Sequence, residues 1–186
     1  IEMMTTEKGL MLWQIYAQIP PAYRSSINKW AGIMAAGMAL VTNLDDDTLF
    51  TTRQQIRLPL TAVAYNQYCF YVAGTVGRMI TELAITYYNI ERDAGSQLLN
   101  YSEACGRALQ KTNIVKDFAK DLARGDSFLP DEWLQEIDYA PFALKDVPFW
   151  WKKKVLLDVL AELDESVNYV LNLPQTAVGY RKAGLL

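Results

Sequence analysis

Apolar residues recur every three or four positions along most of the chain, and Pro or Gly residues separate the stretches that show this pattern. Such spacing is typical of amphipathic helices. We expect helices over residues 10–18, 22–43, 60–88, 96–124 (or from 102) and 148–171, with the last boundary at Pro174. Strand signals are poor, because alternating β-branched runs bounded by Asn-Gly or Asp-Gly turns are absent. The prediction is an all-α fold, as a single domain over residues 1–186.

Composition and charge narrow the classes of function. Apolar residues make up 51% of the 186 positions, which favours one compact domain with a sizeable core. The formal net charge of -3 gives no electrostatic reason to expect a nucleic-acid partner. No apolar stretch approaches the roughly 20 residues that a membrane-spanning helix needs. We therefore expect an intracellular protein that is soluble or lies at a membrane surface.

Cysteine and histidine usage narrows the chemistry further. Cys69 and Cys105 lie far apart in apolar surroundings, which favours buried, reduced thiols and a reducing compartment. The chain has no histidine, which removes Ser-His and Cys-His nucleophilic schemes and the usual zinc sites. Catalysis would have to use carboxylates, Tyr, Lys, Arg or a hard cation bound by carboxylates.

A polar stripe follows one face of the predicted helix over residues 96–124. Residues advance by about 100° each along a helix, so the stripe borders the apolar face. Two carboxylates one turn apart repel each other, whereas oxygen ligands at this spacing suit a Mg²⁺ ion that also contacts a substrate phosphate. On spacing alone, a solvated stripe paired with Lys116 and Lys120 is an equally good interpretation. The stripe consists of Gln110, Asn113, Asp117 and Asp121.

A second group of residues combines aromatic and glycine positions on one predicted helix. Gly74 and Gly77 each cost about 1 kcal/mol inside a helix relative to Ala. A helix with two such positions usually needs the close approach of a neighbour or a ligand, and a tightly packed core helix explains them equally well. The same stretch of helix places Tyr68, Val72 and Val76 on one face.

Three blocks of sequence resemble the squalene/phytoene synthase family. They have the order and approximate separation that the family shows, and the similarity extends faintly from about residue 33 to residue 173. The blocks are Tyr68-Cys-Phe-Tyr-Val-Ala-Gly-Thr-Val-Gly77, Gly106-Arg-Ala-Leu-Gln-Lys-Thr-Asn-Ile-Val-Lys-Asp117 and Gly125-Asp-Ser-Phe-Leu-Pro130.

The resemblance implies an isoprenoid synthase-type helical bundle around a central apolar cavity. Members of this family join two polyprenyl diphosphates head to head through a cyclopropyl diphosphate. Two aspartate-rich motifs on facing helices hold Mg²⁺ ions, which assist the departure of diphosphate.

The resemblance also implies roles for individual residues. Asp117 and Asp121 match the second aspartate-rich motif and would bind Mg²⁺. Tyr68 matches a tyrosine implicated in the condensation, and an aromatic ring beside a carbocation is physically sensible because its π-face attracts cations. The remaining implied contacts are the diphosphate-binding residues Gln110, Asn113 and Lys116 and the cavity-lining residues Val72, Gly74 and Val76.

The chain departs from the family pattern in several places. The first aspartate-rich motif belongs upstream of the Tyr68 block, and we interpret the polar run 45–47 as a solvated loop instead. Lys116 replaces the usual Arg and loses bidentate phosphate contact, and Asp126 replaces a basic residue. Ile1 in place of Met, and an end before the last family helix, indicate an incomplete or processed chain. We expect these 186 residues alone to be inactive.

Two functions from different classes fit these residues. The first is the condensation of two polyprenyl diphosphates, with farnesyl diphosphate and a squalene-type C30 product favoured over a phytoene-type one. Mg²⁺ and, for squalene formation, NADPH would be the cofactors, and peripheral contact with a membrane is expected because the substrates are lipidic. The alternative is a non-catalytic relative that serves as an assembly factor or structural subunit of a larger complex.

Overall fold

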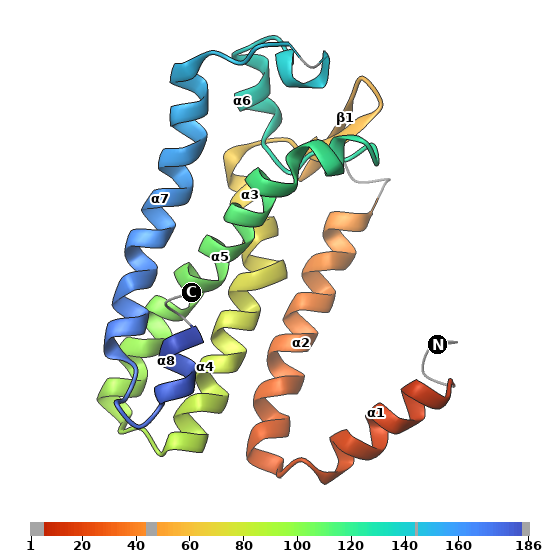
Figure 1. The fold of residues 1–186 in the computed structure, drawn as a ribbon. Helices are drawn as coiled ribbons and strands as arrows, with labels where there is room; N and C mark the ends of the chain where they lie inside the picture. Colours follow the sequence, from red (N-terminus) through yellow and green to blue (C-terminus); the bar gives the residue numbers. More distant parts are fainter. Residues whose placement is uncertain (1–5, 44–47, 144, 184–186) are drawn as a thin grey trace.

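The computed structural model describes residues 6–43, 48–143 and 145–183 (Figure 1). The four longest helices of this part form the body: α2 (Pro21–Thr42), α4 (Thr75–Tyr88), α5 (Arg92–Leu122) and α7 (Phe149–Asn172). Helix α5 packs against both α4 and α7, and α2 packs against α4. Helix α1 (Glu7–Gln18) extends away from the body at the lower right of Figure 1. The predicted all-α fold class is confirmed.

The helix predicted over residues 60–88 is one nearly continuous run with a π-helical middle. Helix α3 (Ala62–Cys69) begins where the Thr61 hydroxyl accepts a hydrogen bond from the Ala64 backbone N–H at 3.2 Å. The π segment η2 (Phe70–Gly74) joins α3 to α4, and α4 ends at Asn89, whose φ of 49° is left-handed. π segments frequently occur at functional sites, and this one begins two residues after Tyr68.

Helix α5 begins earlier than the sequence predicts, at Arg92 instead of Ser96 or Ser102. Both serine hydroxyls bond back to carbonyls of the same helix, Ser96 to Arg92 and Ser102 to Leu99, each at 2.9 Å. A serine that bonds back in this way lies inside a helix and does not cap it. The helix ends at Leu122, two residues before the predicted end at residue 124, and Gly125 follows with a φ of 87° that favours glycine.

A short antiparallel hairpin precedes α3, and the sequence did not predict it. Strand β1 (Phe50–Arg53) pairs with β2 (Ile56–Pro59). The signal was missed because the turn uses Gln54 and Gln55 at φ values of 49° and 66°, where Asn-Gly or Asp-Gly is usual. The backbone of Arg57 in β2 also pairs with the loop after α5. Its N–H donates to the Gly125 carbonyl at 2.9 Å, and its carbonyl accepts from the Ser127 N–H at 2.8 Å. The run 45–47 that we interpreted as a solvated loop lies outside the described residues.

After α5 come two short helices, α6 (Asp131–Gln135) and η3 (Ala140–Ala143), and then α7. A further helix, α8 (Val178–Ala183), lies beyond the boundary predicted at Pro174. Its Tyr180 hydroxyl lies 2.6 Å from the Tyr169 hydroxyl on α7, which ties this last helix to the body. Within the described ranges, none of the helices is both long and apolar enough for a bilayer crossing.

Glycines allow α4 and α5 to pack closely. A Cβ atom added at Gly77 would lie 2.2 Å from the Ser102 carbonyl oxygen, and one at Gly106 would lie 2.1 Å from the Ala73 carbonyl oxygen. At Gly74 the added atom would meet the Phe70 ring at 2.9 Å. The expected close approach of a neighbour is therefore observed, and it holds the helix that follows Tyr68 directly on α5.

Candidate active site

Tyr68 lies in a layer of aromatic rings that three separate segments build. Its side chain is 7% exposed, and its ring stacks on Phe128 with centroids 4.7 Å apart and planes 8° apart. Phe50 of β1 meets the Tyr68 ring edge-on at 6.0 Å. Offset-stacked and edge-to-face pairs of this kind each contribute about 0.5–1.5 kcal/mol beyond simple burial. The hairpin and the loop after α5 therefore both serve to fix the ring of Tyr68.

The Tyr68 hydroxyl lies among polar groups of α5 and the following loop. Burial, together with smaller contributions from the charges of Cys69, Asp121 and Asp126, raises the pKa of Tyr68 to about 12. The Gln110 side chain acts in the opposite direction on this pKa. Tyr68 is consequently neutral at physiological pH, and the structure brings it together with Gln110 and Asp121, both of which the sequence predicted as site residues.

Asp117 and Asn113 lie on the same stripe of α5 and share one lysine. The Lys116 ammonium donates to the Asn113 side-chain oxygen at 2.8 Å and lies 3.6 Å from the Asp117 carboxylate. The Asp117 side chain is 40% exposed and that of Lys116 64% exposed, so the ion pair contributes little to stability. Asp117 is therefore accessible, and its ion-pair partner among the described residues is the exposed Lys116.

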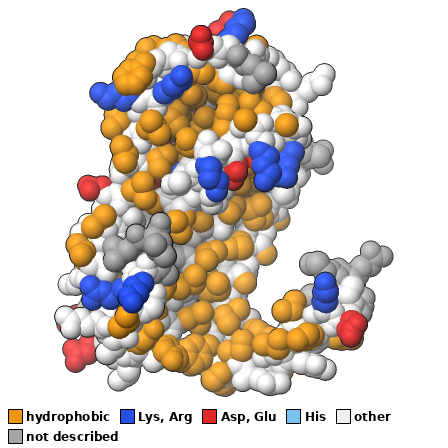
Figure 2. All heavy atoms as spheres, in the orientation of Figure 1, with side chains coloured by type: hydrophobic (Ala, Val, Ile, Leu, Met, Phe, Trp, Pro, Cys, Tyr) orange, Lys and Arg blue, Asp and Glu red, His pale blue; other side chains and the backbone are white. Residues whose placement is uncertain are grey.

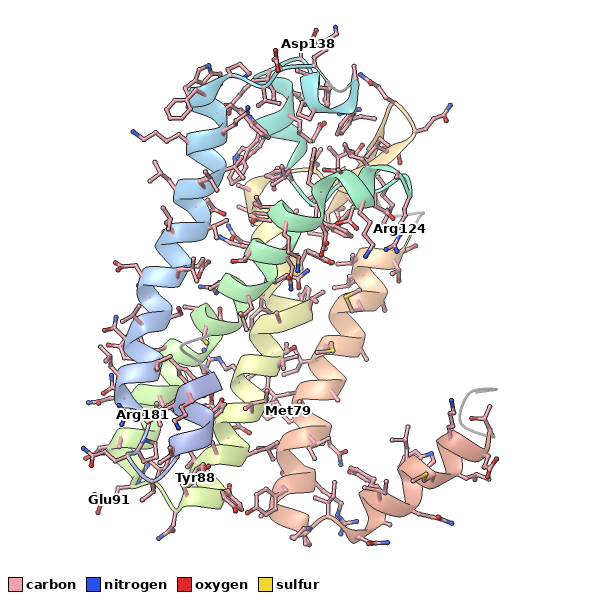
Figure 3. The ribbon with its side chains drawn as sticks, in the orientation of Figure 1. Met79, Tyr88, Glu91, Arg124, Asp138 and Arg181 are labelled. Atoms are coloured by element: carbon pink, nitrogen blue, oxygen red, sulfur yellow. The ribbon has the colours of Figure 1, made fainter. Side chains whose placement is uncertain are left out.

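Asp121 occupies the last turn of α5, where its backbone carbonyl accepts hydrogen bonds from Arg124 at 2.8 Å and Asp126 at 3.1 Å. Figure 3 labels Arg124 at this end of the helix. In the part of the chain that the structure describes, no Lys or Arg forms an ion pair with the Asp121 carboxylate. Two acidic side chains lie one turn apart, and few basic groups neutralise their negative charges. Such an arrangement favours binding of a cation.

The donor set fits Mg²⁺ as a partial site. No group of three or more His, Cys, Asp or Glu side chains that could hold a metal occurs among the described residues. Mg²⁺ commonly uses only one or two carboxylates and completes its shell with waters and phosphate oxygens. Asp117 and Asp121 supply such a pair, so a metal here would depend on a phosphate-bearing ligand for part of its coordination.

The three predicted cavity residues lie in different surroundings. Val72 packs against the core cluster that contains Tyr68. Gly74 is buried against Phe70 and the Glu103 side chain. Val76 lines a cavity of about 260 Å³ between α4, α5 and the C-terminal segment.

This cavity is almost entirely apolar, and the sequence did not predict the two tyrosines that line it. Tyr169 and Tyr180 line it, and a hydrogen-bond chain runs from the Tyr180 hydroxyl to Tyr169 at 2.6 Å and on to Thr81 at 2.7 Å. No sequence pattern pointed to Tyr180, because it follows Pro174, where the predicted helices end. An aromatic pair whose hydroxyls bond to each other presents apolar ring surface to the cavity.

Another feature that the sequence did not indicate lies on the α7 side of α5. Lys111 is 2% exposed, and its ammonium lies 3.0 Å from Asp158 and 3.1 Å from Glu162 on α7. The Arg107 guanidinium also binds Glu162, at 2.9 Å. A lysine between Gln110 and Asn113 resembles any other residue of a polar stripe in sequence, so only the packing of α7 on α5 identifies it as a buried charge.

A family model for squalene/phytoene synthase matches residues 7–178. The chain belongs to the squalene/phytoene synthase family. The squalene synthase of Saccharomyces cerevisiae is 35% identical over 134 residues, which are 70% of this chain and 27% of that protein. The Candida albicans squalene synthase is 31% identical over 118 residues, 63% of this chain and 25% of that protein. A bifunctional lycopene cyclase/phytoene synthase of Arthroderma gypseum is 34% identical over 76 residues, 40% of this chain and 13% of that protein.

A solved complex of TcSQS with a ligand shares the fold of this squalene/phytoene synthase family member. Its TM-score is 0.54 at 24% identity, and the match covers 86% of this chain and 42% of that chain. The chain spans about a quarter of the length of the two squalene synthases that it matches. The family and the fold are therefore established, and the activity of the whole protein is addressed next.

Proposed function

We propose that this family member takes part in the head-to-head condensation of two polyprenyl diphosphates, with farnesyl diphosphate and a squalene-type C30 product favoured. The observation that carries the proposal is that the ring of Tyr68, fixed between Phe50 and Phe128, lies close enough to the stripe on α5 for Gln110 and Asp121 to influence its hydroxyl. The resemblance to squalene synthases over 63–70% of the chain supports the squalene-type product.

The stripe on α5 is proposed to bind one diphosphate group. Asp117 and Asp121 would hold Mg²⁺, which supplies charge neutralisation as the diphosphate leaves, and the family uses Mg²⁺ for diphosphate ionisation generally. Asn113 and Gln110 would donate side-chain N–H groups to phosphate oxygens. Lys116 can turn from Asn113 and Asp117 toward a phosphate, because its side chain is 64% exposed.

Tyr68 is proposed to act at the prenyl chain. Its neutral ring, held by Phe50 and Phe128, offers a fixed aromatic surface beside the diphosphate stripe. Such a surface stabilises a developing carbocation by cation–π attraction. The apolar cavity that Val76 lines would accommodate part of the hydrocarbon chain, since its lining has little to offer a polar ligand.

Two further parts of the proposal follow from the squalene-type product. Forming squalene requires a reductant, so we include NADPH as the second cofactor. Both substrate and product are lipidic, which favours a protein in the cell interior that works at a membrane surface.

The alternative function is that of a non-catalytic subunit of a larger complex, and one observation favours it. The Lys116 ammonium contacts both Asn113, a predicted diphosphate ligand, and Asp117, a predicted Mg²⁺ ligand. In a non-catalytic relative this lysine would stay in place and the stripe would be only a solvated face. Mg²⁺-dependent binding of a diphosphate separates the two functions.

The test is binding of a farnesyl diphosphate analogue with a non-transferable diphosphate to the full protein, measured calorimetrically with and without Mg²⁺. Asp117→Asn should weaken Mg²⁺-dependent binding at least about tenfold, because charge-assisted contacts to a bound ion are lost. Asp164→Asn, an exposed acid-to-amide change on α7, is the matched control and should bind like the wild type. Equal affinity with and without Mg²⁺ in the wild-type protein would favour the non-catalytic subunit.

A further inference from the structure

The beginning of α7 exposes two large aromatic side chains next to each other. Phe149 is 80% exposed and Trp150 is 53% exposed, although they follow a proline and open a regular helix. Their neighbour Trp151 is 4% exposed, and its ring N–H donates to the Trp133 carbonyl at 2.6 Å. The buried Trp151 anchors this turn to the core and thereby holds the other two rings outward.

Lysines surround the two exposed rings. Lys152 and Lys153 follow directly on α7 and are exposed, and Lys145 lies exposed in the segment before α7. Asp146 offsets one of these charges, and Lys154 is taken up by an ion pair with Glu136. Figure 2 shows hydrophobic and Lys or Arg side chains side by side at the upper left of the molecule, where α7 begins.

The helix end itself adds to the positive potential. The first turn of α7 contains no acidic residue, and among the described residues no side chain caps its N–H groups. Helix N-termini with free N–H groups favour anions. Figure 3 shows Asp138 at the top of the molecule, in the segment that precedes α7.

An apolar cavity adjoins this surface. It has a volume of about 280 Å³ and uses Val147, Trp151, Lys152 and Leu156 of the same region together with Phe118 of α5. Leu156, Leu157 and Leu160 continue the exposed apolar surface along α7, at 50%, 52% and 54% exposure. The start of α7 thus combines exposed aromatic rings, neighbouring lysines and an adjoining apolar surface.

We propose that this surface, made of Phe149, Trp150, Lys152 and Lys153 and called here the α7 tip, inserts into a lipid bilayer that contains anionic headgroups. Aromatic rings and lysines together suit the boundary between acyl chains and headgroups, because rings bury there while ammonium groups remain at the phosphates. A protein partner would require a complementary apolar patch, whereas the lysines next to the rings fit an anionic interface. The inference rests on the membrane contact included in the proposed function and assigns it to a surface, and its test is separate from the condensation because bilayer contact needs no catalysis.

The test uses the full protein and sedimentation with unilamellar vesicles of phosphatidylcholine, either pure or with roughly one third phosphatidylserine. The Phe149→Ser/Trp150→Ser variant should lose about tenfold or more in partitioning to both vesicles, because two exposed rings no longer bury. The Lys152→Gln/Lys153→Gln variant should lose about tenfold on the phosphatidylserine vesicles and little on pure phosphatidylcholine.

Tyr87→Ser is the matched control, because Tyr87 is 71% exposed on α4, near the opposite end of the molecule from the α7 tip. It should bind vesicles like the wild type. Binding that survives the double aromatic change would show that another surface, such as the exposed apolar residues of α1, meets the bilayer, and would overturn the proposal. So would wild-type protein that stays in the supernatant with both vesicles. Unchanged circular dichroism of each variant ensures that the loss reflects the surface and not unfolding.

Discussion

The two sides of α5 differ in whether their charged side chains are buried and have partners of opposite charge. Toward α7, Lys111 is 2% exposed and meets two carboxylates within 3.1 Å. On the stripe, Asp121 has no basic partner among the described residues, and Asp117 has only the exposed Lys116 at 3.6 Å. The same helix thus carries a buried lysine with two carboxylate partners on one side and nearly unpaired, accessible carboxylates on the other.

The difference shows how to tell structural charge from functional charge. A buried ion is tolerated in a fold only when partners compensate its lost hydration, as those of Lys111 do. Accessible carboxylates one turn apart repel each other and contribute nothing evident to folding. The unpaired side is therefore where a ligand is expected, and the paired side is where mutations should act on stability.

The largest expected effect is on the paired side. Lys111→Met removes the ammonium but keeps a similar apolar length, and it leaves Asp158 and Glu162 without their buried partner. We expect a loss of about 3 kcal/mol in the free energy of unfolding, at the low end for a broken buried pair because Asp158 is a quarter exposed. Urea denaturation of the full protein measures it.

The matched control for that change is Lys116→Met on the accessible side of the same helix. Its ion pair is exposed, so the free energy of unfolding should change by no more than about 0.5 kcal/mol. If the two variants lost equal stability, the contrast between the two sides of α5 would be wrong.

A buried carboxylate elsewhere extends the comparison to pH. Asp131 is fully buried, which by itself raises its pKa, but hydrogen bonds from Tyr139 at 2.6 Å, Arg53 at 3.1 Å and Gln135 at 2.8 Å lower it below the ordinary value. The folded-state pKa is thus lower than the unfolded one of about 3.9. The ionised group therefore stabilises the fold above that value, and this contribution disappears as pH falls through the folded-state pKa.

Asp131→Asn should accordingly lower the melting temperature at neutral pH, with a difference from the wild type that narrows as the pH drops below about 4. Thermal unfolding between neutral and acidic pH measures the trend. Asp138→Asn, an exposed neighbour on the same segment, should follow the wild type at every pH. A constant difference for Asp131→Asn would mean that its carboxylate is not the titrating group.

Sequence patterns predicted the helices and missed the parts that depend on neighbours. Pro148 marked the start of α7 because proline fixes φ, and Gly125 marked the end of α5 because glycine readily adopts a positive φ. The hairpin at Gln54 and Gln55 was not predictable, because its strands are fixed by burial of Phe50 and by bonds to the loop after α5 and not by turn residues.

The candidate site was predicted in the same uneven way. Gln110, Asn113, Asp117 and Asp121 lie on one helix, so helical periodicity alone placed them together. Phe128 was missed, because its stacking on Tyr68 joins segments 60 residues apart and leaves no local signal. Contacts between distant segments follow from packing, which a single sequence does not display.

The smallest expected effect on stability concerns Asp121, and it tests whether the stripe on α5 is kept for ligand binding. Asp121 lies in the last turn of α5, where its negative charge faces the negative end of the helix dipole and Asp117 one turn away. Asp121→Asn should therefore raise the free energy of unfolding by about 0.5 kcal/mol in the absence of Mg²⁺, while it weakens Mg²⁺-dependent diphosphate binding.

Asp93→Asn is the matched control, because Asp93 lies in the first turn of the same helix, where a negative charge is favourable. It should lower stability slightly and leave diphosphate binding unchanged. Opposite signs of the stability changes for the two variants would show that Asp121 is kept against the preference of the fold, as a ligand-binding carboxylate is. If Asp121→Asn destabilised the protein instead, the residue would belong with Lys111 among the structural charges.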